Sequence, residues 1–173
     1  KGVRYDVYVE DDAYALYDAE MQQSKNKSIL PKRTRFYQGL MALGYLETGD
    51  EYVKLADSYV IFICTFDPFN EGLCCYEFFN HCGGYEGIGD IPLGDGRKIL
   101  IYNTKGTMVN VSPEVEAFLR YIENGEAKDE YTWKLHGSVT KARHNRKWRV
   151  EYMKTFVHDI DVRREGIELG RTY

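Results

Sequence analysis

The sequence predicts one mixed α/β domain, with a central sheet of mixed strand direction and an appended helical carboxy-terminal region. Three observations favour this class. Apolar and polar residues alternate near the amino terminus, a continuous apolar run covers residues 59–64, and several other segments have apolar residues at helical spacing. The 173 residues are enough for one domain and short for two.

The first expected element is an antiparallel hairpin. Residues 3–10 alternate between apolar and polar side chains, and a period of two indicates a half-buried strand. Residues 14–22 form a second strand in which Asp18, Glu20 and Gln22 share a polar face, because side chains of a strand alternate between its two faces. A short acidic turn joins the two strands.

A helix is expected after this hairpin. Pro31 suits the first turn of a helix, where its missing N–H is not needed. Residues 32–46 then carry Phe36, Leu40 and Leu43 at helical spacing. The helix is therefore amphipathic, with one face available for packing.

The central strand is expected at residues 59–64. Such a continuous run of β-branched and aromatic residues favours a strand that is buried on both faces. Further strands are expected at residues 74–79 and 98–102, and the glycine-rich stretch 83–96 is expected to be a loop.

Two helices complete the expected order. Ser112 and Pro113 are a capping residue and a first-turn proline, which mark a helix start. A final helix is expected over residues 139–163. It carries an apolar stripe at steps of four, made by Trp148, Tyr152, Phe156 and Ile160.

Composition limits the partners and the location. The net charge of −4 gives no overall attraction to nucleic acid, so any contact with DNA needs a local basic patch. No apolar run approaches the roughly 18 residues of a membrane span, and we expect no membrane partner. The four cysteines form no CxxC pair, and together with the absence of a secretory segment they favour reduced thiols in the cytoplasm.

A pair of carboxylates is the strongest candidate for chemistry. Asp6 and Glu20 lie on the polar faces of the two hairpin strands, so closing the hairpin brings them together. Hydrolysis of a phosphodiester needs a divalent cation, and Mg²⁺ takes oxygen ligands, usually one or two carboxylates with waters and phosphate oxygens. Gln22 projects beside Glu20. The alternative is a solvated sheet face without chemistry.

The wider sequence resembles the PD-(D/E)XK nuclease family transposases, the recombination-promoting nucleases of bacteria. The blocks that carry the resemblance lie at residues 3–11, 18–22, 30–38, 58–64, 66–69, 102–106 and 148–153. The resemblance implies a restriction-endonuclease-like fold, a mixed sheet flanked by helices. Only five residues precede Asp6, so we expect the leading helix and strand of that fold to be absent from this chain.

The resemblance also implies roles for individual residues. Asp6 and Glu20 would be metal ligands, together with the backbone carbonyl of Met21, and the cofactor would be Mg²⁺ or Mn²⁺. Gln22 stands where the family usually has a catalytic Lys. An amide holds a water molecule by hydrogen bonds but carries no charge and does not act as a base at neutral pH.

Contacts with DNA are expected from the start of the first helix. Lys32, Arg33 and Arg35 cluster there, and a helix amino terminus already favours phosphate. We expect these residues and Gln38 to bind the DNA backbone, with Arg33 or Gln38 reaching the active site. A solvated basic turn is the competing interpretation.

The expected function is Mg²⁺-dependent hydrolysis of DNA phosphodiester bonds by an endonuclease, associated with transposition or recombination. The nuclease core is expected at residues 1–110 and a helical extension at residues 111–173. Two alternatives remain open. One is a DNA-binding protein of the same fold that has lost cleavage, and the other is a protein-interaction module that forms a homo-oligomer through its Tyr-rich sheet and long final helix.

Overall fold

The computed structural model describes residues 6–23, 29–83 and 91–147. Its contacts divide the chain into two compact units, Lys1–Asn124 and Gly125–Tyr173. No helix among the described residues is long and apolar enough to cross a membrane.

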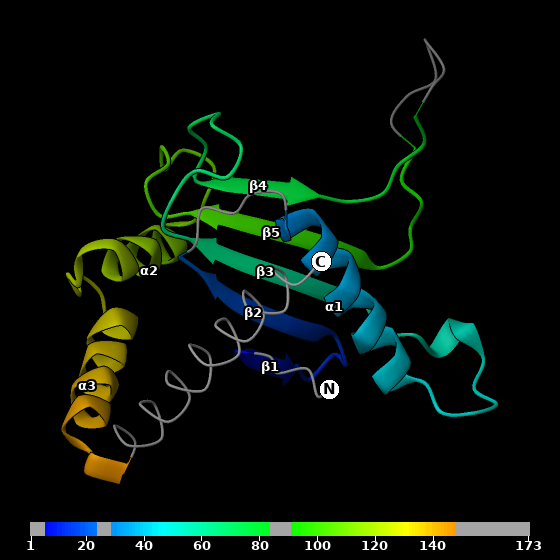
Figure 1. Ribbon diagram of the computed structural model, residues 1–173, viewed down its shortest axis with the longest axis horizontal. Coiled ribbons are helices and arrows are strands. Elements are labelled where there is room, and N and C mark those ends of the chain that lie inside the picture. The colour runs from blue at the N-terminus through cyan, green and yellow to red at the C-terminus, as the bar shows by residue number, and fades with distance from the viewer. Residues whose placement is uncertain (1–5, 24–28, 84–90, 148–173) are drawn as a thin grey trace, which may run out of the picture. The chain divides into compact units, whose positions relative to one another are not determined.

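The first unit contains a five-stranded mixed sheet with the strand order β1-β2-β3-β5-β4 (Figure 1). Its strands are β1 (Val7–Glu10), β2 (Leu16–Gln22), β3 (Ser58–Cys64), β4 (Cys75–Phe78) and β5 (Arg97–Asn103). Strands β2, β3 and β5 run parallel, while β1 and β4 pair antiparallel at the two edges. The predicted mixed α/β class and the predicted amino-terminal hairpin are both confirmed.

The three parallel strands are in register over their whole length. Leu16 pairs with Ser58, which pairs with Arg97, and six residues later Gln22 pairs in the same way with Cys64, which pairs with Asn103. The carboxyl ends of all three strands therefore meet at one edge of the sheet. Glu20 and Gln22 lie close to that edge.

Helix α1 (Leu30–Tyr45) covers one face of the sheet (Figure 1). Pro31 lies in its first turn, as expected, and the helix starts two residues earlier than predicted. The buried core between α1 and the sheet is made by Leu16, Leu30, Tyr37, Met41, Val60, Phe62, Cys64, Phe66, Tyr76 and Ile101. A short 3-10 turn, η2 (Tyr52–Lys54), follows between α1 and β3.

Strand β3 lies where the apolar run predicted it. Val60 and Phe62 are fully buried and Ile63 is nearly so, but Ile61 is only half-buried. The prediction that every residue of this strand is buried is therefore wrong at Ile61. Ile61 lies on the face opposite Val60 and Phe62, because neighbouring residues of a strand alternate in direction, and α1 covers the Val60 side.

Helix α2 (Pro113–Asn124) ends the first unit, and it begins where Ser112 and Pro113 predicted a helix start. The Ser112 hydroxyl accepts a long hydrogen bond of 3.4 Å from the Val115 N–H. Leu119 is the residue of this helix that is fully buried. The helix also brings Glu123 to the Thr104 hydroxyl, just beyond β5.

The second unit contains α3 (Glu130–His144), which differs from the predicted helix. The helix begins nine residues before Val139, because Asp129 and Thr132 form a reciprocal capping box that fixes its start. It ends before Asn145, so the predicted continuous helix to residue 163 is interrupted there. The predicted stripe from Trp148 onward lies outside the described residues.

Candidate functional site

The β1–β2 hairpin brings Asp6 next to Glu20. Val7 pairs with Ala19, so Asp6, which directly precedes β1, lies opposite Glu20. The Asp6 N–H donates to Glu20 Oε1 at 3.1 Å, and the Met21 N–H donates to Asp6 Oδ2 at 3.1 Å. The two carboxylates are therefore neighbours at one end of β2, as the hairpin predicted.

The polar face of β2 is buried at Asp18 and Glu20, so the alternative interpretation of a solvated sheet face is wrong for these two residues. Asp18 is 0% exposed and Glu20 is 3% exposed, whereas Asp6 is exposed. The reason is that α1 packs on this face and covers it with Tyr37 and other side chains of its inner surface. Burial of charged side chains requires partners, and α1 supplies them to Glu20.

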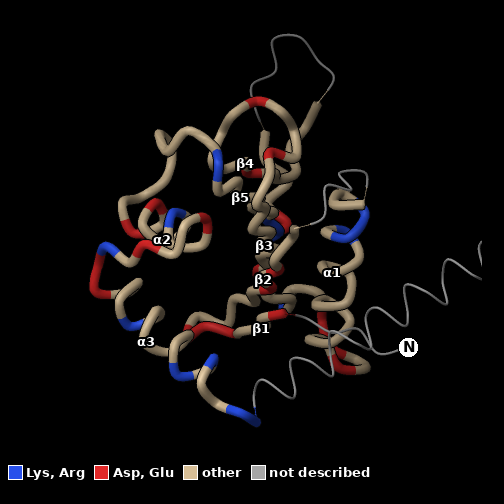
Figure 2. The backbone as a smooth tube through the Cα atoms, turned by 60° about the vertical axis from the view of Figure 1, so that its left-hand side comes forward, with Lys and Arg blue, Asp and Glu red and all other residues tan. Residues whose placement is uncertain are grey.

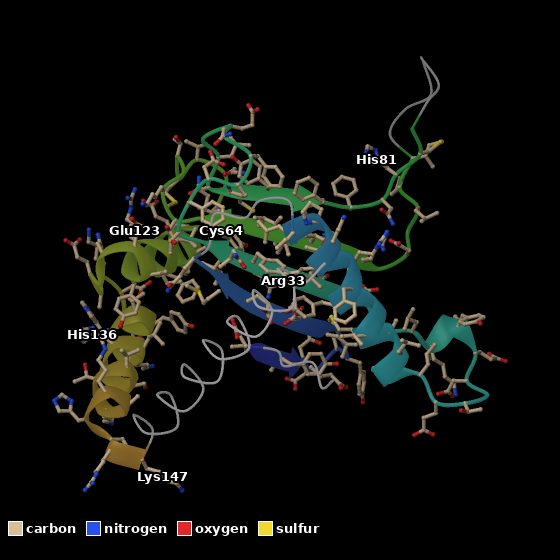
Figure 3. All side chains as sticks on the ribbon, in the orientation of Figure 1. Arg33, Cys64, His81, Glu123, His136 and Lys147 are labelled. Carbon is tan, nitrogen blue, oxygen red and sulfur yellow. The ribbon has the colours of Figure 1, made fainter. Side chains whose placement is uncertain are left out.

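Arg33 of α1 connects the members of this site. Its Nη2 forms an ion pair with Glu20 Oε2 and also donates to the Tyr37 hydroxyl at 2.8 Å, while its Nη1 donates to Gln22 Oε1 at 2.6 Å. The Tyr37 O–H in turn donates to Glu20 Oε2 at 3.2 Å. Figure 3 shows Arg33 between α1 and the sheet, where its guanidinium lies 4.9 Å from the ring centre of Phe62.

Every oxygen of the Glu20 carboxylate has a hydrogen-bond partner. Oε1 accepts from the Asp6 N–H, and Oε2 accepts from both Arg33 and Tyr37. The burial of Tyr37 raises the pKa of its phenol, and the Arg33 charge partly opposes that rise, so Tyr37 stays protonated and remains a donor at neutral pH.

Asp18 is the unusual member of this face. It lies two residues before Glu20 and is fully buried, and neither of its carboxyl oxygens has a hydrogen-bond partner among the described residues. Burial raises the pKa of Asp18 to about 7, with a further contribution from the Glu20 charge, while the Arg33 charge lowers it. Asp18 therefore changes protonation state near neutral pH.

Cys64 lies beside Gln22 in the β2–β3 register, but it does not have the properties of a nucleophile. Burial raises the pKa of its thiol to about 11, and the Arg33 charge offsets this only partly. The reactive form of a cysteine is the thiolate, so Cys64 is a core residue.

The four residues predicted to bind DNA separate into different environments. Lys32 and Arg35 are exposed, Arg33 turns inward to Glu20, and Gln38 is buried and donates to the Lys98 carbonyl at 3.1 Å. Arg33 therefore reaches the candidate site and Gln38 does not. The basic residues of α1 gather at its amino-terminal end (Figure 2).

Arg35 and Gln38 instead line a cavity of about 460 Å³. Its other walls include Leu16, Ser58 and Arg97, which are the first residues of the three parallel strands. The cavity is therefore at the opposite end of the sheet from Glu20 and Gln22.

Two residues of the site had no role predicted from the sequence: Tyr37, and Asp18, which was predicted only to share the polar face of its strand. Tyr37 follows Arg33 by one helical turn, so residue spacing alone places the two side chains on the same side of α1. Asp18 shares the face of Glu20 by the alternation of the strand. Both spacings can be seen in the sequence, but they indicate a common site only when it is known that α1 covers this face of β2.

Carboxylate oxygens are the kind of ligand that a divalent cation such as Mg²⁺ takes in proteins. Within residues 6–23, 29–83 and 91–147, no group of three or more His, Cys, Asp or Glu side chains is arranged to hold a metal ion. Mg²⁺ is commonly held by only one or two carboxylates, with waters and substrate phosphate completing its shell. Asp6 and Glu20 provide such a pair, but Glu20 Oε2 has to exchange its bond to Arg33 for one to the cation.

Comparison with models of protein families, with curated proteins and with solved structures finds no match. Function therefore has to be inferred from the geometry and chemistry of these residues.

Proposed function

We propose that the chain is the core of a Mg²⁺-dependent DNA endonuclease of the PD-(D/E)XK type, acting in transposition or recombination. The observation that supports this most directly is the contact between Asp6 and Glu20, with Gln22 and Arg33 beside them. Two carboxylates, an amide and a guanidinium are groups suited to binding a cation and a phosphodiester.

Asp6, Glu20 and the Met21 carbonyl would hold the cation, which could be Mg²⁺ or Mn²⁺. The Met21 N–H already reaches Asp6, and the N–H and C=O of one strand residue lie on the same side of the strand, so its carbonyl is directed to the edge where Asp6 lies. When bound, the cation would supply Lewis-acid chemistry to the phosphate. The hard oxygen ligands match this choice of metal.

Gln22 and Arg33 would interact with the attacking water and the substrate phosphate, and not with the cation. Arg33 provides a positive charge close to the candidate scissile phosphate, and a guanidinium matches phosphate geometry well. Gln22 orients the attacking water by hydrogen bonds and does not take its proton, because an amide does not titrate near neutral pH. The proton then leaves to solvent or to a phosphate oxygen.

The DNA backbone would approach the amino-terminal end of α1. Lys32 is exposed there, and the first turn of α1 contains no acidic residue. Backbone N–H groups at a helix start favour phosphate, and a lysine strengthens that preference. The exposed Arg35 would contribute further along the same helix.

Two other functions are supported by single observations. The ion pair that occupies Glu20 favours a DNA-binding protein without cleavage. The exposure of Val7 and Val9, 53% and 51%, favours a protein-interaction module that associates through this edge of the sheet.

Nicking of supercoiled plasmid in Mg²⁺ or Mn²⁺ tests the proposal, with Asp6→Asn as the inactive variant and Asp12→Asn as the matched control. Asp12 is also an exposed acidic residue of the hairpin, but it lies in the turn away from Glu20. Cleavage lost in Asp6→Asn and kept in Asp12→Asn supports the endonuclease. DNA binding without cleavage indicates the DNA-binding protein that does not cleave, and self-association without DNA binding indicates the protein-interaction module.

A further inference from the structure

The helix of the second unit carries a concentration of positive charge. The whole chain has a net charge of −4, but residues 131–147 contain no acidic side chain, so all 27 acidic residues lie elsewhere. This stretch has five basic residues, which Figure 2 shows in blue along α3 and directly after it: Lys134, Lys141, Arg143, Arg146 and Lys147. An acidic protein can bind a polyanion only through such a local basic surface.

Most of this charge is available to a partner. Four of the five residues are exposed and form no ion pair with a residue that the structure describes: Lys141, Arg143, Arg146 and Lys147. The fifth, Lys134, pairs with Glu130, but the two side chains are 75% and 80% exposed, and so open a pair contributes little. The negative end of a helix dipole amounts to only about half a charge, so it leaves most of this positive charge uncompensated.

An exposed aromatic ring lies on the same side of α3 as part of this charge. Trp133, Gly137 and Lys141 follow one another at steps of four, so they form one row along the helix. Trp133 is 61% exposed, and its Nε1 donates to the Ala127 carbonyl at 3.1 Å, which orients the ring. No described atom lies within 4 Å of the place where a Cβ of Gly137 would stand. The row therefore combines an accessible ring, an open stretch of backbone and a lysine.

We propose that these six residues, Trp133 and the five basic residues, form a surface that binds single-stranded DNA. We call it the α3 basic surface. The basic side chains would neutralise phosphates, and an unpaired base would stack on the Trp133 ring, which are the two contacts typical of proteins that bind single strands. Bases of a duplex are already stacked on their neighbours, so an exposed tryptophan beside the cations favours the single strand. The inference deepens the proposed function and rests on it only in that the chain binds DNA, because cleavage is not required.

The salt dependence of binding tests the charge contacts. Fluorescence anisotropy of a labelled deoxythymidine oligonucleotide measures the affinity of the full chain at several salt concentrations, without divalent cation so that the oligonucleotide stays intact. For a single strand, each phosphate contact contributes about 0.7 to the slope of log affinity against log salt concentration. Replacing Lys141, Arg143, Arg146 and Lys147 together by Gln should therefore lower this slope by about 2–3. An unchanged slope overturns the proposal.

Two control variants separate the position of the charge from its amount. The first keeps every charge of the surface and should keep the slope: Lys141→Arg, Arg143→Lys, Arg146→Lys and Lys147→Arg. The second removes the same amount of charge from exposed residues of the first unit by substitution with Gln: Lys54, Lys98, Lys105 and Arg120. Its slope should stay close to that of the parent, and a loss equal to that of the α3 variant overturns the proposal.

Circular dichroism establishes that each variant is folded. If the variant with four substitutions does not fold, the double variant Lys141→Gln with Lys147→Gln takes its place, and its slope should fall by about 1.4. An unchanged slope in the folded double variant overturns the proposal in the same way.

Trp133→Ala separates stacking from charge. It should weaken binding of the single strand on the order of tenfold, and it should leave the salt slope unchanged because stacking neutralises no phosphate. Binding of a duplex of the same length should not depend on Trp133. Tyr52→Ala is the matched control, since Tyr52 is an aromatic residue of the first unit that is 87% exposed. A Trp133→Ala variant that binds the single strand as tightly as the parent, or loses as much affinity for the duplex, overturns the single-strand assignment.

Plasmid nicking in Mg²⁺ separates this inference from the proposed function. Single-strand binding with the expected dependence on the α3 basic surface, but without cleavage by the parent, supports the surface and rejects the endonuclease. Cleavage by the parent, with an unchanged salt slope in the α3 variant, supports the endonuclease and rejects the surface. A parent chain that binds no DNA overturns both, and binding to phosphatidylserine vesicles in its place would assign the surface to anionic lipid.

Discussion

Arg33 of α1 forms an ion pair with Glu20 of β2, and the Glu20 side chain is 4% exposed while that of Arg33 is 29% exposed. The pair joins the helix to the sheet at the site where the cation would bind. Glu20 is therefore both a structural residue and a candidate ligand, whereas Asp6 is exposed and is not part of the ion pair. The two carboxylates should respond differently to substitution.

We predict that Glu20→Gln and Asp6→Asn both abolish divalent-cation binding but differ in stability. Glu20→Gln leaves Arg33 without its charged partner, and we expect a loss of about 1–3 kcal/mol in the free energy of unfolding. Asp6→Asn should change stability by less than about 1 kcal/mol, as exposed positions usually do. Urea denaturation and Mn²⁺ calorimetry measure the two effects, and unchanged cation binding in both variants would exclude the metal site.

Gln22→Ala should lower the rate of DNA cleavage by about ten- to a hundredfold while leaving Mn²⁺ binding intact. The metal ligands Asp6, Glu20 and Met21 remain, but the water loses its hydrogen-bonding partner. Plasmid cleavage and calorimetry together measure this separation. A Gln22→Ala variant that cuts as fast as the parent assigns Gln22 no catalytic role and makes Arg33 the stronger candidate.

The companion substitution Gln22→Lys restores the residue more common in the family that the sequence resembles. Gln22 Oε1 accepts a hydrogen bond of 2.6 Å from Arg33, so a lysine there places two positive charges together. We expect Gln22→Lys to weaken the Arg33 contact and to lower stability by about 1 kcal/mol or more, because a favourable contact is replaced by repulsion. Thermal unfolding of Gln22→Lys beside Gln22→Ala checks this expectation, and a more stable lysine variant would contradict it.

The core of β3 gives a prediction that separates its two faces. Phe62 is fully buried beneath α1, and Phe62→Ala should cost about 3–5 kcal/mol. Ile61→Ala should cost less, about 1–2 kcal/mol, because Ile61 is only half-buried and loses fewer contacts. Urea denaturation of the two variants measures the difference, and equal losses would mean that the Ile61 face is covered in solution.

Asp18 makes stability depend on pH. Its pKa rises from 3.8 to about 7 on folding, chiefly because burial disfavours the charge. The folded state therefore holds the proton more tightly than the unfolded state, and the free energy of unfolding should fall as pH rises from about 4 to about 7 and then level off. In Asp18→Asn this fall should be smaller by about 1–3 kcal/mol. Parallel pH profiles for parent and variant would contradict the assignment.

Much of the fold follows from local sequence patterns. The apolar run of β3, the alternation in β1 and the Pro31 helix start each act over a few residues, and the structure has these elements where the patterns put them. The capping box of Asp129 and Thr132 marks the start of α3, whereas the apolar stripe from Trp148 onward predicts helix further along the chain.

Local sequence patterns do not predict which face of the sheet α1 covers. A strand with Asp18, Glu20 and Gln22 on one face appears solvent-facing, because charged residues are rarely buried without partners. The partner of Glu20 is Arg33, on a different element, and this pairing is set by the packing of α1 rather than by spacing along β2. The same packing explains why Ile61, on the other face, is less buried than Phe62.

The parallel ladder of β2, β3 and β5 also has a kinetic consequence. Parallel neighbouring strands cannot be joined by a tight turn. During synthesis, the edge of β2 that pairs with β3 therefore stays unpaired until β3 has been made, and the other edge of β3 stays unpaired until β5 has been made. Pairings between distant segments slow folding, often to milliseconds or seconds. The hairpin and α1 depend on contacts between nearby residues and can form first. The unpaired edge of β3, a strand of mostly apolar residues, is then accessible to other chains until β5 has been synthesised. Recovery of folded protein should therefore improve when synthesis is slowed by lower temperature and the concentration of incomplete chains is low.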